Sequence, residues 1–191
     1  MSETKEEILR ATYRVLCEDG FADLTMQAIA DEADVSKSLL HYHYDTKQDL
    51  IVAFLERFID RFEEELDELD ADDPAERLDA IVDELLLGKA DDEHTDFGRA
   101  FLELRAQATH VPAYREQLAR NADYLQNVIV STIEDGIEAG VFEDDDPEGT
   151  ARLIRAAVDG ARSQQITLGD DTREVVREGI EAHVLSDIRV E

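Results

Sequence analysis

The residues best suited to chemistry gather in one stretch, Lys37–His43, which reads KSLLHYH. It combines an ammonium, a hydroxyl, aliphatic side chains and rings with polar tips. Ammonium, hydroxyl and imidazole groups donate hydrogen bonds to phosphates and base edges, and an aliphatic side chain can contact the methyl group of thymine. No carboxylate occurs between residues 35 and 44. This combination is typical of a surface that binds nucleic acid.

Two short helices joined by a tight turn are predicted to position this stretch. Thr25 can cap a helix over residues 26–33, and Ser36 can cap a second one over residues 37–44, because a hydroxyl accepts a free N–H at a helix start. Only residues 34 and 35 lie between the first helix and the cap Ser36 of the second. This is the spacing of a helix-turn-helix.

The second of these helices is expected to have distinct inner and outer faces. Leu40 and Tyr44 lie four residues apart and can turn inward together. The predicted DNA-binding residues comprise the outer face and the polar residues at nearby helix starts: Thr25, Gln27, Ser36, Lys37, Ser38, Leu39, His41, Tyr42, His43 and Lys47. His41 and His43 point about 200° apart around a helix, so they are expected to contact DNA and not to share a metal ion.

The charge around this motif is unusual for a DNA-binding surface. Residues 1–50 hold eleven acidic and five basic side chains, a net charge of −6. Arg10 and Arg14 should lie on the exposed face of the first helix, and Lys47 should add its ammonium to the free N–H groups of a helix capped by Thr46, a suitable phosphate site. Specific contacts must therefore supply more of the affinity than electrostatic attraction does.

The rest of the chain is predicted to be all-α, because apolar residues recur with a helical period almost throughout. Thr4 and Glu7 can form a capping box at the first helix, and Gly20 can end it. After Gly140, the following Val141 and Phe142 can fold back. The expected helices span residues 4–20, 26–33, 37–44, 47–69, 74–87, 95–108, 112–140, 147–168 and 172 onward.

Composition places the chain among acidic globular proteins. Its 191 residues include 48 Asp or Glu and 19 Lys or Arg, a formal charge of −29, yet 43% of residues are hydrophobic and only three are Pro. The carboxylates are spread along the whole chain. In molar salt the Debye length falls to about 3 Å, which removes most of their mutual repulsion. This favours a salt-rich cytoplasm over an ordinary acidic mesophilic protein.

Several classes of function lack support in the sequence. No stretch is apolar enough to cross a membrane, and no signal sequence follows Met1, so a cytoplasmic location is expected. The single cysteine, Cys17, excludes an internal disulfide and is interpreted as a structural filler. Glycine-rich phosphate loops, His-Glu-x-x-His and Gly-x-Ser-x-Gly are missing. We therefore expect neither catalysis nor a metal or cofactor.

The N-terminal residues resemble the TetR/AcrR family of transcriptional regulators. The resemblance covers about residues 4 to 55 and rests on these residues at the family's fixed offsets: Gly20, Thr25, Ile29, Ala30, Ala33, Asp34, Val35, Ser36, Leu40, His41, Tyr42, His43, Tyr44, Lys47 and Leu50. Asp34 stands where the family usually has a turn glycine, and Ser38 replaces a frequent small residue. His41 stands where a tyrosine commonly touches the DNA backbone, a contact that Tyr42 could take over.

The resemblance implies a division into two domains. Residues 1–46 would form a three-helix helix-turn-helix domain that binds double-stranded DNA, and residues 47–191 a six-helix domain for effector binding and dimerisation. The residues implied at the effector cavity are Phe97, Phe101, Arg105, His110, Tyr114 and Tyr124. Those implied at the homodimer contact are Leu153, Ile154, Ala157, Val158, Ala161, Val176, Ile180, Val184 and Ile188.

The function implied by the resemblance is that of a repressor released from a palindromic operator by a small-molecule effector. Each aromatic residue at the implied cavity could equally be plain core, and each polar one plain surface. The alternative function is a helical effector-binding or adaptor protein that does not bind DNA. Substitution of Lys37 and Tyr42 separates the two functions, because only a regulator would lose its operator.

Overall fold

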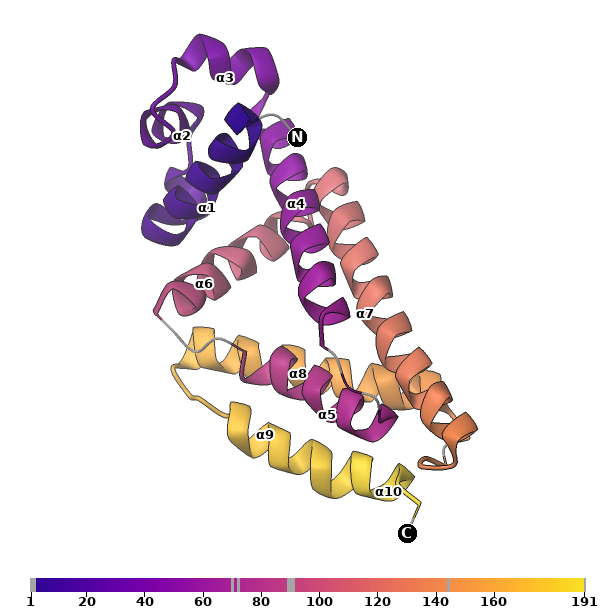
Figure 1. The fold of residues 1–191 in the computed structure, drawn as a ribbon. Helices are drawn as coiled ribbons and strands as arrows, with labels where there is room; N and C mark the ends of the chain where they lie inside the picture. Colours follow the sequence, from indigo (N-terminus) through magenta and orange to yellow (C-terminus); the bar gives the residue numbers. More distant parts are fainter. Residues whose placement is uncertain (1–2, 70, 72, 89–91, 144, 191) are drawn as a thin grey trace. The chain divides into compact units, whose positions relative to one another are not determined.

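The computed structural model describes residues 3–69, 71, 73–88, 92–143 and 145–190, with the backbone alone for residues 92–97 (Figure 1). In these ranges the chain is helical apart from its turns and one isolated bridge between Phe142 and Arg189, which confirms the all-α prediction. No helix there is long and apolar enough to cross a membrane. The elements are α1 (Glu3–Asp23), α2 (Met26–Glu32), α3 (Lys37–His43), α4 (Lys47–Asp67), α5 (Pro74–Leu86), α6 (Asp92–Gln107), α7 (Pro112–Ala139), α8 (Pro147–Leu168), α9 (Arg173–Ile180), the π-helical η1 (Glu181–Leu185) and α10 (Ser186–Ile188).

Helix starts and ends follow the local chemistry of the sequence. Asp73 and Asp146 each accept a backbone N–H at the start of α5 and α8, and a proline follows each of them. At the ends of α7 and α8, Gly140 and Gly169 have φ of 72° and 70°, the left-handed conformation that glycine adopts without strain. Gly20 also breaks α1, with φ 76° and ψ 177°, and a last helical turn follows it.

Several predicted boundaries are wrong by a few residues. Thr4 lies inside α1 and does not cap it, because the helix already includes Glu3, and an acidic residue is favourable in a first turn. The sixth helix begins at Asp92, ahead of the predicted start at residue 95, in a polar segment without apolar periodicity. Thr172 makes no side-chain cap at α9, and the last predicted helix continues through η1 and α10.

The chain folds as two compact units that do not follow its linear order. One unit comprises Met1–Phe62 and Asp91–Arg120, and the other comprises Glu63–Ala90 and Asn121–Glu191. The first unit therefore includes most of α4, all of α6 and the start of α7 together with α1, α2 and α3. A division of the structure by packing thus differs from the expected division at residue 46.

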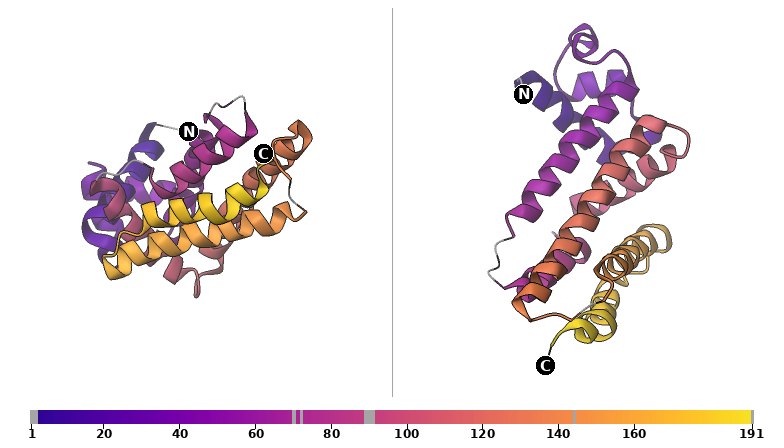
Figure 2. Two further views of the ribbon diagram at one scale, coloured as in Figure 1. Left: turned by 90° about the horizontal axis from the view of Figure 1, so that it is seen from below. Right: turned by 90° about the vertical axis from the view of Figure 1, so that its right-hand side faces the viewer.

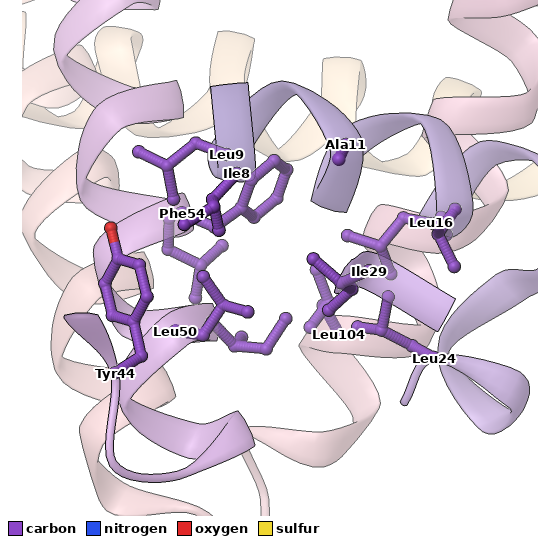
Figure 3. Packing of buried hydrophobic residues seen from close by; sticks show 14 of the residues in the cluster. Ile8, Leu9, Ala11, Leu16, Leu24, Ile29, Tyr44, Leu50, Phe54 and Leu104 are labelled. Carbon is purple, nitrogen blue, oxygen red and sulfur yellow. The ribbon is translucent and has the colours of Figure 1, made fainter. Parts of the chain in front are cut away.

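The first unit has one hydrophobic core, built largely from α1, α2, α4 and α6. Helix α6 contributes Ala100 and Leu104, and Ala108 follows directly after it; the three residues are spaced four apart and are all buried. Figure 3 shows Leu104 pointing toward Leu24, which lies between α1 and α2, and toward Ile29 within α2. The side chain of Leu104 is fully buried. Helix α6 is therefore part of the core that supports the two short helices.

In the second unit, α8 and α9 lie side by side and α5 packs against both of them (Figures 1 and 2). Two arginines near the end of the chain bind carboxylates of α5 and η1. Arg177 bonds Asp79 at 3.0 Å and also bonds Asp83, while Arg189 bonds Asp79 at 2.6 Å and Glu181 at 2.5 Å. Because Asp79 of α5 binds both arginines, it joins α5 to α9 through Arg177 and to the end of the chain through Arg189.

The turn after α7 folds back as predicted. Phe142 is buried against Gly136, and the Val190 N–H donates to the Val141 carbonyl at 3.1 Å. The Glu143 N–H donates to the Ile188 carbonyl at 2.7 Å. These contacts fix the last described residues beside the turn.

We expect Gly136→Ala to destabilise the protein, because a methyl group at this position would overlap the Phe142 ring. Overpacking of this kind costs about 1–3 kcal/mol of the free energy of unfolding. Urea unfolding followed by circular dichroism measures the loss. Gly179→Ala in α9 is the control, since its methyl group would meet no heavy atom within 4 Å. Equal stabilities for the two variants would contradict the described packing of Phe142.

Candidate nucleic-acid interface

The helix-turn-helix is built by the two predicted caps. The Thr25 Oγ1 accepts the Ala28 N–H at 3.0 Å, and the Ser36 Oγ accepts the Leu39 N–H at 3.1 Å. Each hydroxyl keeps its own hydrogen for donation, so both residues can cap a helix and still bind a phosphate. The predictions that Thr25 and Ser36 start these two helices are confirmed.

The turn between α2 and α3 depends on one residue in the left-handed conformation. Asp34 has φ 52°, which an aspartate adopts more readily than most residues. This conformation lets the Val35 N–H donate to the Ala30 carbonyl at 3.0 Å and directs the chain into α3. The aspartate therefore replaces the usual turn glycine without loss of the turn.

Helix α3 presents its polar residues outward. Leu40 and Tyr44 are buried, as predicted, and this fixes the opposite face toward solvent. Tyr42 is 81% exposed and Leu39 39% exposed, and the Tyr42 ring meets the His43 ring edge-on at 5.2 Å. The remaining outward side chains, Lys37, Ser38 and His41, are exposed, and that of His43 is partly buried.

Two predicted contact residues are already engaged within the protein. The Gln27 amide donates to Asp31 at 2.7 Å on α2. Lys47 Nζ donates to the Phe21 carbonyl at 3.2 Å and lies 4.2 Å from the centre of the Phe21 ring. Burial lowers the pKa of Lys47. The ammonium is therefore held at the edge of the core and retains two N–H donors for a phosphate.

The N-terminus of α4, where Lys47 is the first residue, is capped by Thr46 and Asp49. The Thr46 Oγ1 accepts the Asp49 N–H at 3.1 Å, and Asp49 accepts the Thr46 N–H at 3.0 Å. This reciprocal pair is a capping box with aspartate in place of glutamate.

The arginines of α1 are paired with carboxylates. Arg14 donates to Glu7 at 2.9 Å and also to Glu32, and these hydrogen bonds raise the pKa of Arg14. Arg10 lies 3.9 Å from both Glu6 and Glu7. Both cations therefore lie close to carboxylates, whereas exposed Lys37 carries its positive charge on a face without carboxylates. The pairing of Arg14 with Glu32 joins residues 18 positions apart, for which the sequence offers no signal.

The residues implied at an effector cavity fall in both compact units. Tyr114 is buried in the core of the first unit, where its ring meets Phe21 edge-on at 6.5 Å, while Tyr124 belongs to the second unit and donates to Asp67 at 2.9 Å. Burial and this hydrogen bond raise the pKa of Tyr124 to about 12. Phe101 lies half-buried with its ring 5.8 Å from Phe58.

The other three residues of this set differ in exposure. Arg105 and His110 are exposed. The side chain of Phe97 lies outside the described part of the structure. Neither sequence nor contacts therefore define a single effector site.

The residues implied at a dimer contact lie on α8, α9, η1 and α10. Five of them are buried inside the second unit by the packing of the single chain: Ile154, Val158, Ala161, Ile180 and Ile188. Ala157, Val176 and Val184 are partly buried. Leu153 is 57% exposed, and sequence reasoning missed the two other exposed apolar side chains here, Leu168 at 74% and Val175 at 68%.

Comparison with known proteins identifies relatives over the whole chain. Residues 8–54 match the family described as bacterial regulatory proteins of the tetR family, and residues 74–188 match the C-terminal domain of BetI-type transcriptional repressors. The crystal structure of a TetR transcription regulator from Haloarcula marismortui ATCC 43049 is 37% identical, with a TM-score of 0.92 over 99% of this chain and 100% of that one.

More distant relatives extend the comparison. A regulator from Saccharomonospora viridis, solved in complex with choline, is 24% identical and shares the fold with a TM-score of 0.82 over the full length of both chains. The regulator BetI of Stenotrophomonas maltophilia (strain R551-3) is 30% identical over 113 residues, 56% of each chain. The regulator YerO of Bacillus subtilis (strain 168) is 36% identical over 59 residues, 31% of this chain. The matches thus span 56% and 20% of these two curated relatives.

We expect Ser36→Ala to destabilise the protein by about 1 kcal/mol, because the Leu39 N–H loses its acceptor at the start of α3. Thermal unfolding monitored by circular dichroism measures the change. Ser38→Ala is a matched control two residues along, since this exposed serine lies inside the helix, where alanine has the higher helix propensity. A control as unstable as Ser36→Ala would show that the cap is not the cause.

Proposed function

The chain belongs to the TetR family of transcriptional regulators, and from this we propose that it is a repressor that binds a palindromic DNA operator as a homodimer and releases it on binding a small-molecule effector. The observation that carries the proposal is the outward face of α3, which has hydrogen-bond donors, aromatic tips and no carboxylate. In chain order, residues 1–46 would supply the DNA-binding domain and residues 47–191 the effector-binding and dimerisation domain.

In the proposed complex, α3 enters the major groove. Lys37 can donate to the acceptors of guanine or to a phosphate, and Leu39 can contact a thymine methyl group. The exposed Tyr42 hydroxyl can bind a backbone phosphate, the contact for which the family commonly uses a tyrosine at position 41. The caps Thr25 and Ser36 and the ammonium of Lys47 complete the phosphate contacts.

Two copies are needed to read a palindromic operator. Their recognition helices must lie about 34–36 Å apart to meet successive half-sites. We place the contact between the copies on the exposed face of α8 and α9, with Leu153, Leu168 and Val175 as its large apolar residues. This narrows the interface implied by the resemblance, because buried Ile154 and Ile180 pack within the protomer.

The effector is proposed to act through a difference in affinity between two states. A ligand releases DNA only if it binds the released state more tightly than the DNA-bound state. Of the residues implied by the resemblance, exposed Arg105 and His110 and half-buried Phe101 have surface that a ligand can reach. Choline, the ligand of the Saccharomonospora viridis relative, is the first compound to test.

The high negative charge of the chain favours function in a salt-rich cytoplasm. A net charge of −29 opposes the approach of DNA in dilute buffer, and concentrated salt screens this repulsion.

We expect the protein to bind DNA from upstream of its own gene with two protomers per site. Fluorescence anisotropy in about 1 M KCl, with an unrelated fragment as competitor, measures the binding. Lys37→Ala and Tyr42→Ala should each weaken operator binding about tenfold or more, because one base or phosphate contact is lost on each half-site. Arg152→Ala removes an exposed cation from α8 and serves as the charge control. Effector-dependent function that survives in both variants would favour an adaptor without DNA binding.

We also expect an unusually weak dependence of operator binding on salt. Arg10 and Arg14 are paired with glutamates, which leaves Lys37 and Lys47 as the positively charged side chains among the proposed phosphate contacts of each protomer. The slope of log K against log salt should therefore be no steeper than about −4 for the dimer. Anisotropy titrations from 0.2 to about 2 M KCl measure it. A slope of about −8 or steeper would require phosphate contacts beyond those proposed.

A further inference from the structure

The backbone N–H and the backbone carbonyl of Phe21 are both held by side chains at the corner where α1 leads toward α2. Its N–H donates to Glu103 Oε2 of α6 at 2.7 Å, and its carbonyl accepts from Lys47 Nζ of α4 at 3.2 Å. We call these three residues the Phe21 clasp. The clasp joins residues 82 and 26 positions apart and lies within the first compact unit.

Gly20 makes the clasp possible in two ways. Its φ of 76° breaks the helical path of α1 immediately before Phe21, so the Phe21 N–H can reach an acceptor outside the helix. A Cβ at this position would lie 3.2 Å from Glu103 Oε2, tighter than an ordinary contact. A side chain at residue 20 would therefore push Glu103 away from the N–H that it accepts.

Side chains pack against the Phe21 ring, whereas an open groove lies beside Glu103. The Lys47 ammonium lies over the Phe21 ring at 4.2 Å, and Tyr114 of α7 meets the same ring edge-on. A groove of about 390 Å³ beside the clasp is lined by Phe21, Ala22, Lys47, Glu103, Ala106 and Gln107. The Glu103 carboxylate can therefore move off the Phe21 N–H without displacing packed atoms.

The two kinds of contact between α6 and the helix-turn-helix respond differently to movement. The apolar contacts of Leu104 tolerate a small slide, because dispersion and burial have little directionality. The hydrogen bond from Phe21 to Glu103 does not, because it weakens steeply with distance and angle. A shift of α6 along its packing face would break the polar contact first.

Resting on the proposed function, we propose that the Phe21 clasp couples α6 to DNA binding, with Glu103 as the positioning residue. The closed clasp fixes the end of α1, and through Leu24 and Ile29 the helix α2, so that α3 keeps its DNA-binding orientation. An effector that shifts α6 opens the clasp and releases that constraint. By linkage, operator DNA must in turn favour the closed clasp.

The test compares three variants that each remove one negative charge: Glu103→Ala, Glu103→Gln and the control Glu116→Ala, an exposed carboxylate on α7. Loss of charge alone should slightly favour DNA binding by this acidic protein. We expect Glu103→Ala to bind the operator about tenfold more weakly, with unchanged affinity for unrelated DNA. Glu103→Gln should recover much of the loss, because its amide oxygen can still accept the Phe21 N–H.

Hydrogen exchange of the Phe21 amide supplies a readout that a general loss of stability would not reproduce. In the wild type this amide should exchange slowly, and more slowly still with operator DNA. In Glu103→Ala it should exchange at least tenfold faster, while the amides of Leu40 and Leu50 in the core keep their rates.

Two results would overturn the coupling. One is an unchanged Phe21 exchange rate in Glu103→Ala, and the other is an equal loss of affinity for operator and unrelated DNA. Failure of the wild type to bind any operator would overturn the proposed function instead. Because exchange in the free protein tests the clasp without DNA, the two failures are distinguishable.

Discussion

Helices α2 and α3 have seven residues each, too few to be stable in water by themselves, so the recognition surface depends on the core beneath it. Each contributes little to that core: α2 buries Ile29 and Ala30, and α3 buries Leu40. The rest comes from α1, α4 and α6, which lie on either side of them in the sequence. The face of α3 that meets solvent is thus fixed by apolar contacts made across the whole first unit.

The sequence was sufficient for features set by neighbouring residues. The caps Thr25 and Ser36 and the inward pair Leu40 and Tyr44 all depend on spacings of four residues or fewer, and each was predicted correctly. The outer face of α3 follows from the same periodicity.

Features set by distant residues could not be predicted in this way. The bond of Glu103 to the Phe21 N–H joins positions 82 apart, and no local pattern marks either partner. On α8 the residues Leu153 and Ile154 are adjacent and equally apolar, yet one is exposed and the other is buried. Only the packing of α5 and α9 against α8 decides which face of α8 remains exposed.

The basic residues of this chain work mainly as internal connections. Arg14 links α1 to α2, Arg120 links α7 to Asp60 of α4, and Arg177 links α9 to α5. With so few cations and so many carboxylates, these three arginines join elements instead of creating a positive surface. The protein thereby keeps its fold connected, while its recognition face relies on hydrogen-bond donors and shape.

The membership of α6 in the first unit bears on how hybrid regulators could be assembled from this protein and a relative. A graft made after residue 46 would keep Leu24 and Ile29 but import foreign partners for them in place of Leu104 and Glu103. The imported effector-binding domain would then pack against a mismatched core. It would transmit effector binding poorly to the DNA-binding helices, even if each part folds well. The residues to exchange must therefore be chosen by their contacts in the fold and not by their position in the chain. The buried face of α6 must be transferred together with the DNA-binding helices that it supports.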